Sequence, residues 1–202
     1  MPRPAMVFFL AILFSPFSIS FAWGQERPRN PQEKTNDLAL WRLLQESDWV
    51  AVGSANPTRV VYTFTDPKCP YCHFLYRASL PYTKAGLQVR HIIVGVLGPK
   101  SVLQAAAILE AKDPQKALVT HEENFSSGGI PPVNSPRPET IKKLGSHQVL
   151  MTTLGIQGTP ATFSLENGKL QGAFGMPHLS DLPKLFGLPE QKQDDPALLR
   201  FR

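Results

Sequence analysis

The chain has few cysteines and no block of like charge, and these two absences exclude several classes of protein. Only two cysteines occur among 202 residues, which excludes a small domain stapled by several disulfides and a four-cysteine zinc site. The 21 Lys and Arg and the 16 Asp and Glu residues are scattered along the chain, so we expect no nucleic-acid partner. With 42% hydrophobic residues, the chain can form the core of one ordinary globular domain.

The N-terminus carries the pattern of an export signal. Arg3 precedes an apolar segment at 5–14, and Ser20 and Ala22 place small residues before a cleavage site after Ala22. This layout predicts a secretory signal peptide over residues 1–22. A retained membrane anchor is the alternative, although the uninterrupted apolar run is shorter than the ~20 residues that a spanning helix needs. We therefore expect an exported protein.

The rest of the sequence predicts one folded domain between two polar ends. Residues 23–40 are polar and interrupted by prolines, which indicates a flexible lead-in. Residues 188–202 are expected to form a C-terminal tail that frays. Between these ends, residues 41–187 contain apolar segments with helical or strand-like spacing. A short helix capped by Asn36 or Asp37 is expected to lead into this domain.

Hydrophobic periodicity and turn residues predict the order of elements in the domain. A helix between two buried strands forms a βαβ unit, and a helical insert follows it. Asn167-Gly168 is the strongest hairpin signal in the chain. The expected elements are strands at 59–65, 89–96, 161–165 and 170–174, and helices at 70–85, within an insert at about 100–155, and at 179–186. The fold class is therefore α/β, with a βαβ unit, a helical insert and a ββα unit.

Both cysteines lie in one motif, Cys69-Pro70-Tyr71-Cys72, directly after the first buried strand. A cysteine at the start of a helix faces unpaired N–H groups and the positive end of the helix dipole, which favour thiolate over thiol. We therefore expect Cys69 to be an exposed nucleophile of low pKa and Cys72 to be the buried resolving thiol. In an oxidising compartment with no other cysteine in the chain, this pair indicates a redox-active disulfide.

Two other interpretations of the motif are open from the residues alone. His73 completes Cys-x-x-Cys-His, the attachment pattern of a c-type haem, and two thiolates with His73 could contribute to a zinc site. Haem attachment does not require the buried strand that precedes the motif here. Adjacent Cys72 and His73 point in different directions on a helix, which disfavours zinc. We therefore expect neither a metal nor another cofactor.

Four segments of the chain carry a recognisable pattern, namely Phe64–Cys72, Val94–Val96, the alanine-rich Ala105–Pro114 and Gly158–Ala161. In this order they resemble the catalytic domain of the DsbC/DsbG periplasmic disulfide isomerases. The Cys-Pro-Tyr-Cys form and the alanine-rich insert are more similar to DsbG than to DsbC. The resemblance implies a thioredoxin-like fold with an inserted helical subdomain. It also implies that Thr159-Pro160 forms the loop whose cis-proline faces the dithiol and whose threonine touches the nucleophile.

The resemblance implies a periplasmic thiol–disulfide oxidoreductase of reductase or isomerase type. Pro70, Tyr71, Thr159 and Pro160 would support the two cysteines. The expected partners are exported proteins with cysteines, bound as transient mixed disulfides, and a membrane protein that donates or accepts electrons. The family's N-terminal dimerisation domain has no counterpart before residue 41, so we expect a monomer. The alternative is a non-catalytic thioredoxin-like binding module of an envelope or secretion assembly, whose disulfide is inert.

Overall fold

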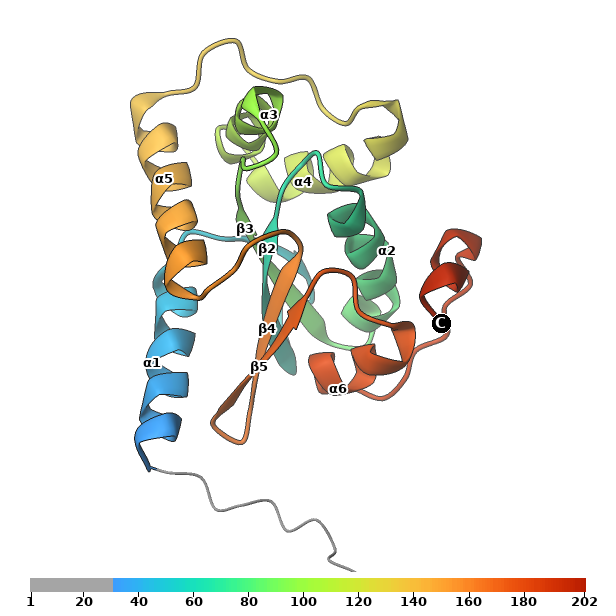
Figure 1. Cartoon of the computed structure of the whole chain (residues 1–202). Coiled ribbons are helices and arrows are strands. Elements are labelled where there is room, and N and C mark those ends of the chain that lie inside the picture. Colours follow the sequence, from blue (N-terminus) through green and yellow to red (C-terminus); the bar gives the residue numbers. More distant parts are fainter. Residues whose placement is uncertain (1–30) are drawn as a thin grey trace, which may run out of the picture.

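The computed structural model in Figure 1 describes residues 31–202. The expected signal peptide and the first part of the lead-in lie outside the described residues. The strands are β1 (Val50–Gly53), β2 (Arg59–Thr65), β3 (Leu87–Ile93), β4 (Ala161–Glu166) and β5 (Lys169–Phe174), and the helices are α1 (Pro31–Glu46), α2 (Pro70–Lys84), α3 (Pro99–Leu109), α4 (Pro114–Glu123), α5 (Pro138–Thr153) and α6 (Leu182–Phe186). Short 3-10 helices are η1 (Phe125–Ser127), η2 (Leu179–Asp181) and η3 (Pro196–Phe201). No helix among residues 31–202 is long and apolar enough to cross a bilayer.

A five-stranded sheet of order β1-β3-β2-β4-β5 forms the centre of the molecule. β2 and β3 are parallel and are joined by α2, while the other neighbouring strands are antiparallel. Helices α1 and α5 lie on one side of this sheet and α2 and α6 on the other, with α3 and α4 at one end (Figure 1). Because helices cover both faces, most residues of β2, β3 and β4 are buried.

The local predictions for the sheet are confirmed. β2 has the predicted bounds, whereas β3 begins two residues before and ends three residues before the predicted strand at 89–96. Asn167 and Gly168 have φ angles of 50° and 72°, the left-handed conformation that a two-residue type I′ hairpin turn requires. Thr63 on β2 lies opposite His91 on β3 and Thr162 on β4. This register places three polar side chains side by side in the middle of the sheet.

The N-terminal part differs from the sequence-based expectation. α1 begins at Pro31 and not at the expected caps, so part of the lead-in is helical. Strand β1 was not predicted, because four residues are too few to show a period and its stability comes from pairing with β3. Trp41 of α1 packs on the sheet, with its ring 4.9 Å from that of Tyr62 in an edge-on arrangement.

The helical insert consists of α3, α4 and α5. Asp113 caps α4, because its carboxylate accepts a hydrogen bond from the N–H of Lys116 at 2.9 Å. The insert buries apolar side chains against β1 and β3. At the start of α3 the chain passes close to Gly95, where a Cβ would lie 2.7 Å from the Cα of Val102. Glycine is therefore required for this close approach.

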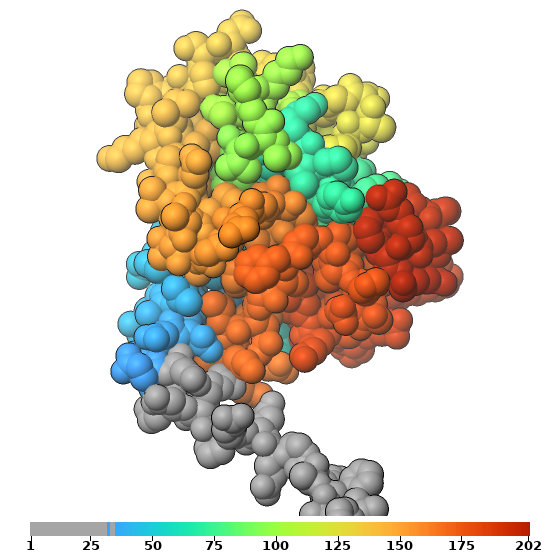
Figure 2. Space-filling view, in the orientation of Figure 1, coloured from blue at the N-terminus to red at the C-terminus, as the bar shows by residue number. Residues whose placement is uncertain are grey.

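The C-terminal segment does not fray, which corrects the expectation for residues 188–202. Leu198 is completely buried in the cluster that contains Leu182 and Phe186. Asp195 caps η3 through the N–H of Ala197 and forms an ion pair with Arg77 of α2 at 2.5 Å. The segment packs against the body of the protein (Figures 1 and 2). Its polar composition suggested disorder. The contacts that hold it come from residues distant in sequence, and local composition does not reveal them.

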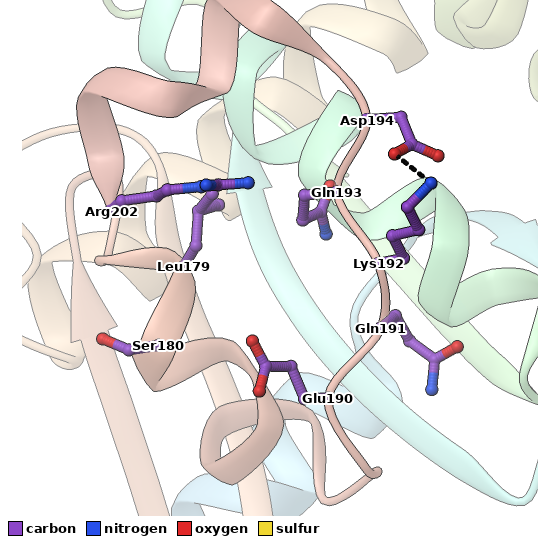
Figure 3. Close-up of a pocket in the computed structure, with 8 residues that line it drawn as sticks. All are labelled: Leu179, Ser180, Glu190, Gln191, Lys192, Gln193, Asp194 and Arg202. Carbon is purple, nitrogen blue, oxygen red and sulfur yellow. Dashed lines mark ion pairs between the residues drawn. The ribbon is translucent and has the colours of Figure 1, made fainter.

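A hollow separates this segment from η2, as Figure 3 shows. Lys192 and Asp194 form an exposed ion pair at 2.7 Å on one side, and Arg202 lies on the other. None of the cysteines or other expected site residues lines the hollow. The segment docks through Leu198 and through contacts of Gln191, Gln193 and Asp195 with α2.

Docking of the C-terminal segment can be tested with neighbouring leucines. Leu198→Ala removes a fully buried side chain and should lower the free energy of unfolding by about 2–3 kcal/mol. Leu199→Ala is the matched control, because Leu199 is 49% exposed and its loss should cost less than about 0.5 kcal/mol. Urea unfolding of both variants gives the comparison. Equal, small effects would mean that the segment is not docked in solution.

Candidate active site

The two cysteines begin helix α2, and the sulfur of Cys69 caps it. Cys69 has an extended backbone conformation, and its Sγ accepts a hydrogen bond from the N–H of Cys72 at 3.4 Å. Pro70 occupies the first turn of the helix, where its missing N–H costs nothing. Both cysteines are free thiols. The predicted position of the motif, directly after β2 and at a helix start, is confirmed.

Cys69 is buried, which corrects the expectation of an exposed nucleophile. Only 4% of Cys69 and 3% of Cys72 are exposed. The Cys69 thiol donates a hydrogen bond to the carbonyl of Thr159 at 3.2 Å, so the loop before β4 covers the sulfur. This loop is 90 residues further along the chain, and no local pattern around the motif indicates that cover.

The pKa values of the two thiols nevertheless differ in the expected direction. Hydrogen bonding with Cys72 is the main cause that lowers the pKa of Cys69 from 9.0 to about 6, and Thr159 and the N–H groups of Cys72 and Tyr71 add to it against the effect of burial. Burial raises the pKa of Cys72 well above 9.0, and its neighbour Cys69 raises it further. At neutral pH, Cys69 is therefore mainly a thiolate and Cys72 a thiol.

The loop that contains Thr159 and Pro160 lies against the dithiol. The peptide bond between these residues is cis, as the resemblance implied. The loop leads into β4, and β4 pairs with β2, so the sheet brings the loop to the start of α2. Thr159 contacts Cys69 through its carbonyl, and its side chain lowers the pKa of both cysteines.

Asp66 holds the loop before the motif and was not identified from the sequence. Its buried carboxylate accepts hydrogen bonds from the N–H groups of Lys68, Val96 and Leu97 and from the hydroxyl of Ser101, at 2.6–3.1 Å. These four donors satisfy the buried charge. They also join the end of β2 to the start of the helical insert. An aspartate at the first position of the turn that closes at Cys69 was the only local signal for this role.

His73 contacts the insert and does not turn back to the sulfurs. Its Nδ1 lies 2.8 Å from a carboxylate oxygen of the buried Glu122, and its ring stacks on Phe125 at 4.5 Å. Nearby, the Nε2 of His121 lies 2.8 Å from the carbonyl of Pro67. Among residues 31–202, no group of three or more His, Cys, Asp or Glu side chains could hold a metal ion. Both histidines tie the motif region to α4.

An aromatic cluster lies beside the motif and includes a residue from the C-terminal segment. Tyr71 is 48% exposed, and its ring lies 6.4 Å from those of Phe74 and Phe201. Arg200 lies over the ring of Phe74 at 4.9 Å. Phe201 and Arg200 were missed because residues 188–202 were expected to fray. The cluster forms an apolar surface with a cationic rim next to Cys69.

Comparison with known proteins first shows the structural class to which the chain belongs. A family model described as a thioredoxin-like domain matches residues 46–180. The catalytic domain of ScsC from Proteus mirabilis has a similar structure, with a TM-score of 0.60 and 20% identity over 75% of this chain and 95% of that one. A periplasmic thioredoxin-like protein from Salmonella enterica serovar Typhimurium gives a TM-score of 0.59 and 21% identity over 73% and 93% of the two chains. These likenesses show the thioredoxin-like fold.

Sequence relatives then narrow the class. The thiol:disulfide interchange protein DsbG of Pseudomonas aeruginosa is 36% identical over 172 residues, which are 82% of this chain and 67% of the relative. DsbG of Escherichia coli is 35% identical over 73% of this chain and 60% of the relative. The chain therefore spans 60% to 67% of the length of these curated relatives. It belongs to the thioredoxin-like family, as a thiol–disulfide oxidoreductase of the DsbC/DsbG type.

The pKa difference between the cysteines predicts the course of alkylation. In the reduced protein, iodoacetamide should modify Cys69 first, at a rate that rises with pH around a midpoint of about 6. Cys72→Ala removes the thiol that is the main cause of the low pKa, so the midpoint should move up toward 9.0. Cys72→Ser keeps a hydroxyl donor and should shift it less. Mass spectrometry identifies the modified residue, and faster modification of Cys72 would reverse the two assignments.

Proposed function

We propose that this chain catalyses thiol–disulfide exchange on exported proteins, with Cys69 as the attacking thiolate and Cys72 as the resolving thiol. The observation that carries the proposal is that the pKa values of the two cysteines shift in opposite directions. The pKa of Cys69 is lowered to about 6, and the pKa of Cys72 is raised. The thiolate is the nucleophilic form of cysteine. Only one of the two sulfurs is therefore ready to attack at neutral pH.

The exchange proceeds in two balanced steps. The Cys69 thiolate attacks one sulfur of a client disulfide, a mixed disulfide forms, and the first client sulfur leaves as a thiolate. Cys72 then loses its proton, which the departing client thiolates can take up. The Cys72 thiolate attacks the Sγ of Cys69, so a Cys69–Cys72 disulfide forms and the second client thiolate leaves. The client disulfide is reduced to two thiols, and the dithiol is oxidised.

The low pKa of Cys69 makes the reduced dithiol nucleophilic at neutral pH, and this is the form that reductase or isomerase chemistry uses. Stabilising that thiolate also makes the Cys69–Cys72 disulfide more oxidising, so the net direction of exchange is set by the redox partner. Repeated reduction then needs a partner that returns the Cys69–Cys72 disulfide to the dithiol. We propose a membrane protein for this role, and a periplasmic location for the chain. The apolar N-terminal segment predicted as an export signal supports that location.

The aromatic cluster beside the motif supplies a contact surface for clients. Tyr71 is exposed and stands between the cysteines in sequence, and Phe74 and Phe201 extend the surface. The loop with Ile130 and Val133 is less available to clients, because Ile130 packs partly against the core of the insert. A few side chains cover far less than the ~800 Å² per partner of a stable interface, so client contacts should be transient.

Substitution of each cysteine tests the assigned roles. Cys72→Ser should accumulate mixed disulfides between Cys69 and client proteins, because the resolving attack is lost. Cys69→Ser should form none and should abolish reduction of insulin. Non-reducing electrophoresis of proteins from the compartment where the chain is expressed gives the measurement. A disulfide that dithiothreitol does not reduce, with no trapped client in either variant, would favour an inert binding module instead.

We further propose that the protein is a monomer and a poor isomerase. The large exposed apolar side chains of the described residues, such as Leu38 on α1, Leu97 before α3 and Phe174 at the end of β5, come from different elements. This spread supports a monomer, because a stable dimer buries a contiguous surface of ~800 Å² per partner. Light scattering should give the mass of one chain, and scrambled ribonuclease should regain little activity. A stable dimer with strong isomerase activity would contradict this proposal.

A further inference from the structure

A small cavity lies beneath Cys72, between α2 and the middle of the sheet. Its volume is about 10 Å³, close to the space that a single water molecule needs. Polar groups from four elements line it. They are Cys72, Tyr76 and Ser79 on α2, Thr63 and Thr65 on β2, His91 on β3 and Thr162 on β4. The buried thiol therefore faces polar groups and not a purely apolar core.

His91 brings an unpaired nitrogen to this cavity. Its Nδ1 lies 2.9 Å from the hydroxyl of Thr65, whereas its Nε2 is buried without a hydrogen-bond partner among the described residues. Among residues 31–202, Nδ1 of His91 is the one hydrogen-bond partner of the Thr65 hydroxyl. If Thr65 donates to Nδ1, the single proton of the neutral ring is on Nε2. Buried polar groups are rarely left unpaired, so this donor requires an explanation.

We propose that His91 assists the resolving step, by donating its Nε2–H to the thiolate of Cys72 as that thiolate forms, directly or through one water in the cavity. The proposal rests on the proposed function, in which Cys72 resolves the mixed disulfide. The donor would be unpaired while Cys72 is a thiol and paired when its sulfur becomes an anion. His91 would therefore stabilise the reactive form of Cys72 more than the resting form.

The surroundings of the cavity are consistent with an uncharged donor. Cys72 and Tyr76 are the titratable groups that α2 presents, while β2 and β4 present only threonine hydroxyls. No lining residue carries a positive charge, so no cation is available there to stabilise a thiolate. Complete burial lowers the pKa of His91 from 6.5 to about 3, which keeps its ring neutral at working pH. The ring lies 6.4 Å from that of Tyr76.

His147 provides a matched control within the same chain. Its Nε2 is also buried without a partner among the described residues, and its Nδ1 lies 2.6 Å from the carbonyl of Ile93. It belongs to α5, however, and does not line the cavity below Cys72. Loss of a buried imidazole at this position therefore perturbs the fold without changing the surroundings of the resolving thiol.

The two thiol attacks can be followed separately with an aromatic disulfide that releases a coloured thiol. The bimolecular first phase reports attack by Cys69, and the unimolecular second phase reports attack by Cys72. His91→Leu should raise the pKa of Cys72 by about one unit. The tenfold loss of thiolate is partly offset by higher nucleophilicity, so the second phase should slow roughly three- to fourfold. Its pH profile should move up by the same unit, with the first phase unchanged.

Rescue and control variants distinguish this role from a structural one. His91→Gln keeps a side-chain N–H donor and should restore most of the second-phase rate, whereas His147→Leu should leave both phases unchanged. Thr65→Val removes the hydroxyl that fixes Nδ1 and should slow the second phase in the same direction. If His91→Leu does not fold, the second-phase rate of Thr65→Val decides whether His91 assists the resolving step.

Two negative results have different meanings. An unchanged second phase and pH profile in His91→Leu, or in Thr65→Val where the first variant does not fold, would overturn the role of His91. Equal slowing in His147→Leu would overturn it as well, because the effect would then be general. Absence of a second phase in the wild-type protein would instead contradict the proposed resolving role of Cys72.

Discussion

The hydrogen bonds that converge on the sulfur of Cys69 are the interactions on which the site depends. This sulfur accepts a hydrogen bond from the N–H of Cys72 and so caps the start of α2. The same contact therefore begins the helix and stabilises a thiolate. The same geometry holds Cys72 deeper in the protein, where burial raises the pKa of its thiol. One helix start thus produces two cysteines of opposite reactivity. The sheet fixes the position of this helix start, because β2 ends shortly before the motif.

The helical insert is joined to the motif by polar contacts and not only by apolar packing. Ser101 donates to Asp66, Glu122 pairs with His73, and His121 lies within hydrogen-bond distance of a carbonyl in the motif loop. Each contact fixes a segment adjacent to the cysteines. Because buried polar groups lose much of their stabilisation when one partner moves, the position of the insert and the shape of the dithiol loop are coupled.

The C-terminal segment adds a feature beyond the matched thioredoxin-like region, which ends at residue 180. Leu198 anchors it in the core, and Phe201 then reaches the exposed ring of Tyr71. The apolar surface beside the motif is therefore built from the start of α2 and from the C-terminal segment. Such a surface can favour unfolded clients with apolar side chains near a disulfide, without the large area that a permanent complex requires.

The sequence by itself determined the features that depend on neighbouring residues. These are the buried strand β2, the Asn167-Gly168 hairpin, the cap at Asp113 and the placement of both cysteines at a helix start. Only the tertiary structure decided that Cys69 is covered, that residues 188–202 dock, that β1 forms, and that His91 lies below Cys72. Local periodicity and capping act over a few residues, whereas these contacts join segments far apart in the chain. Their geometry follows from how the sheet and helices pack.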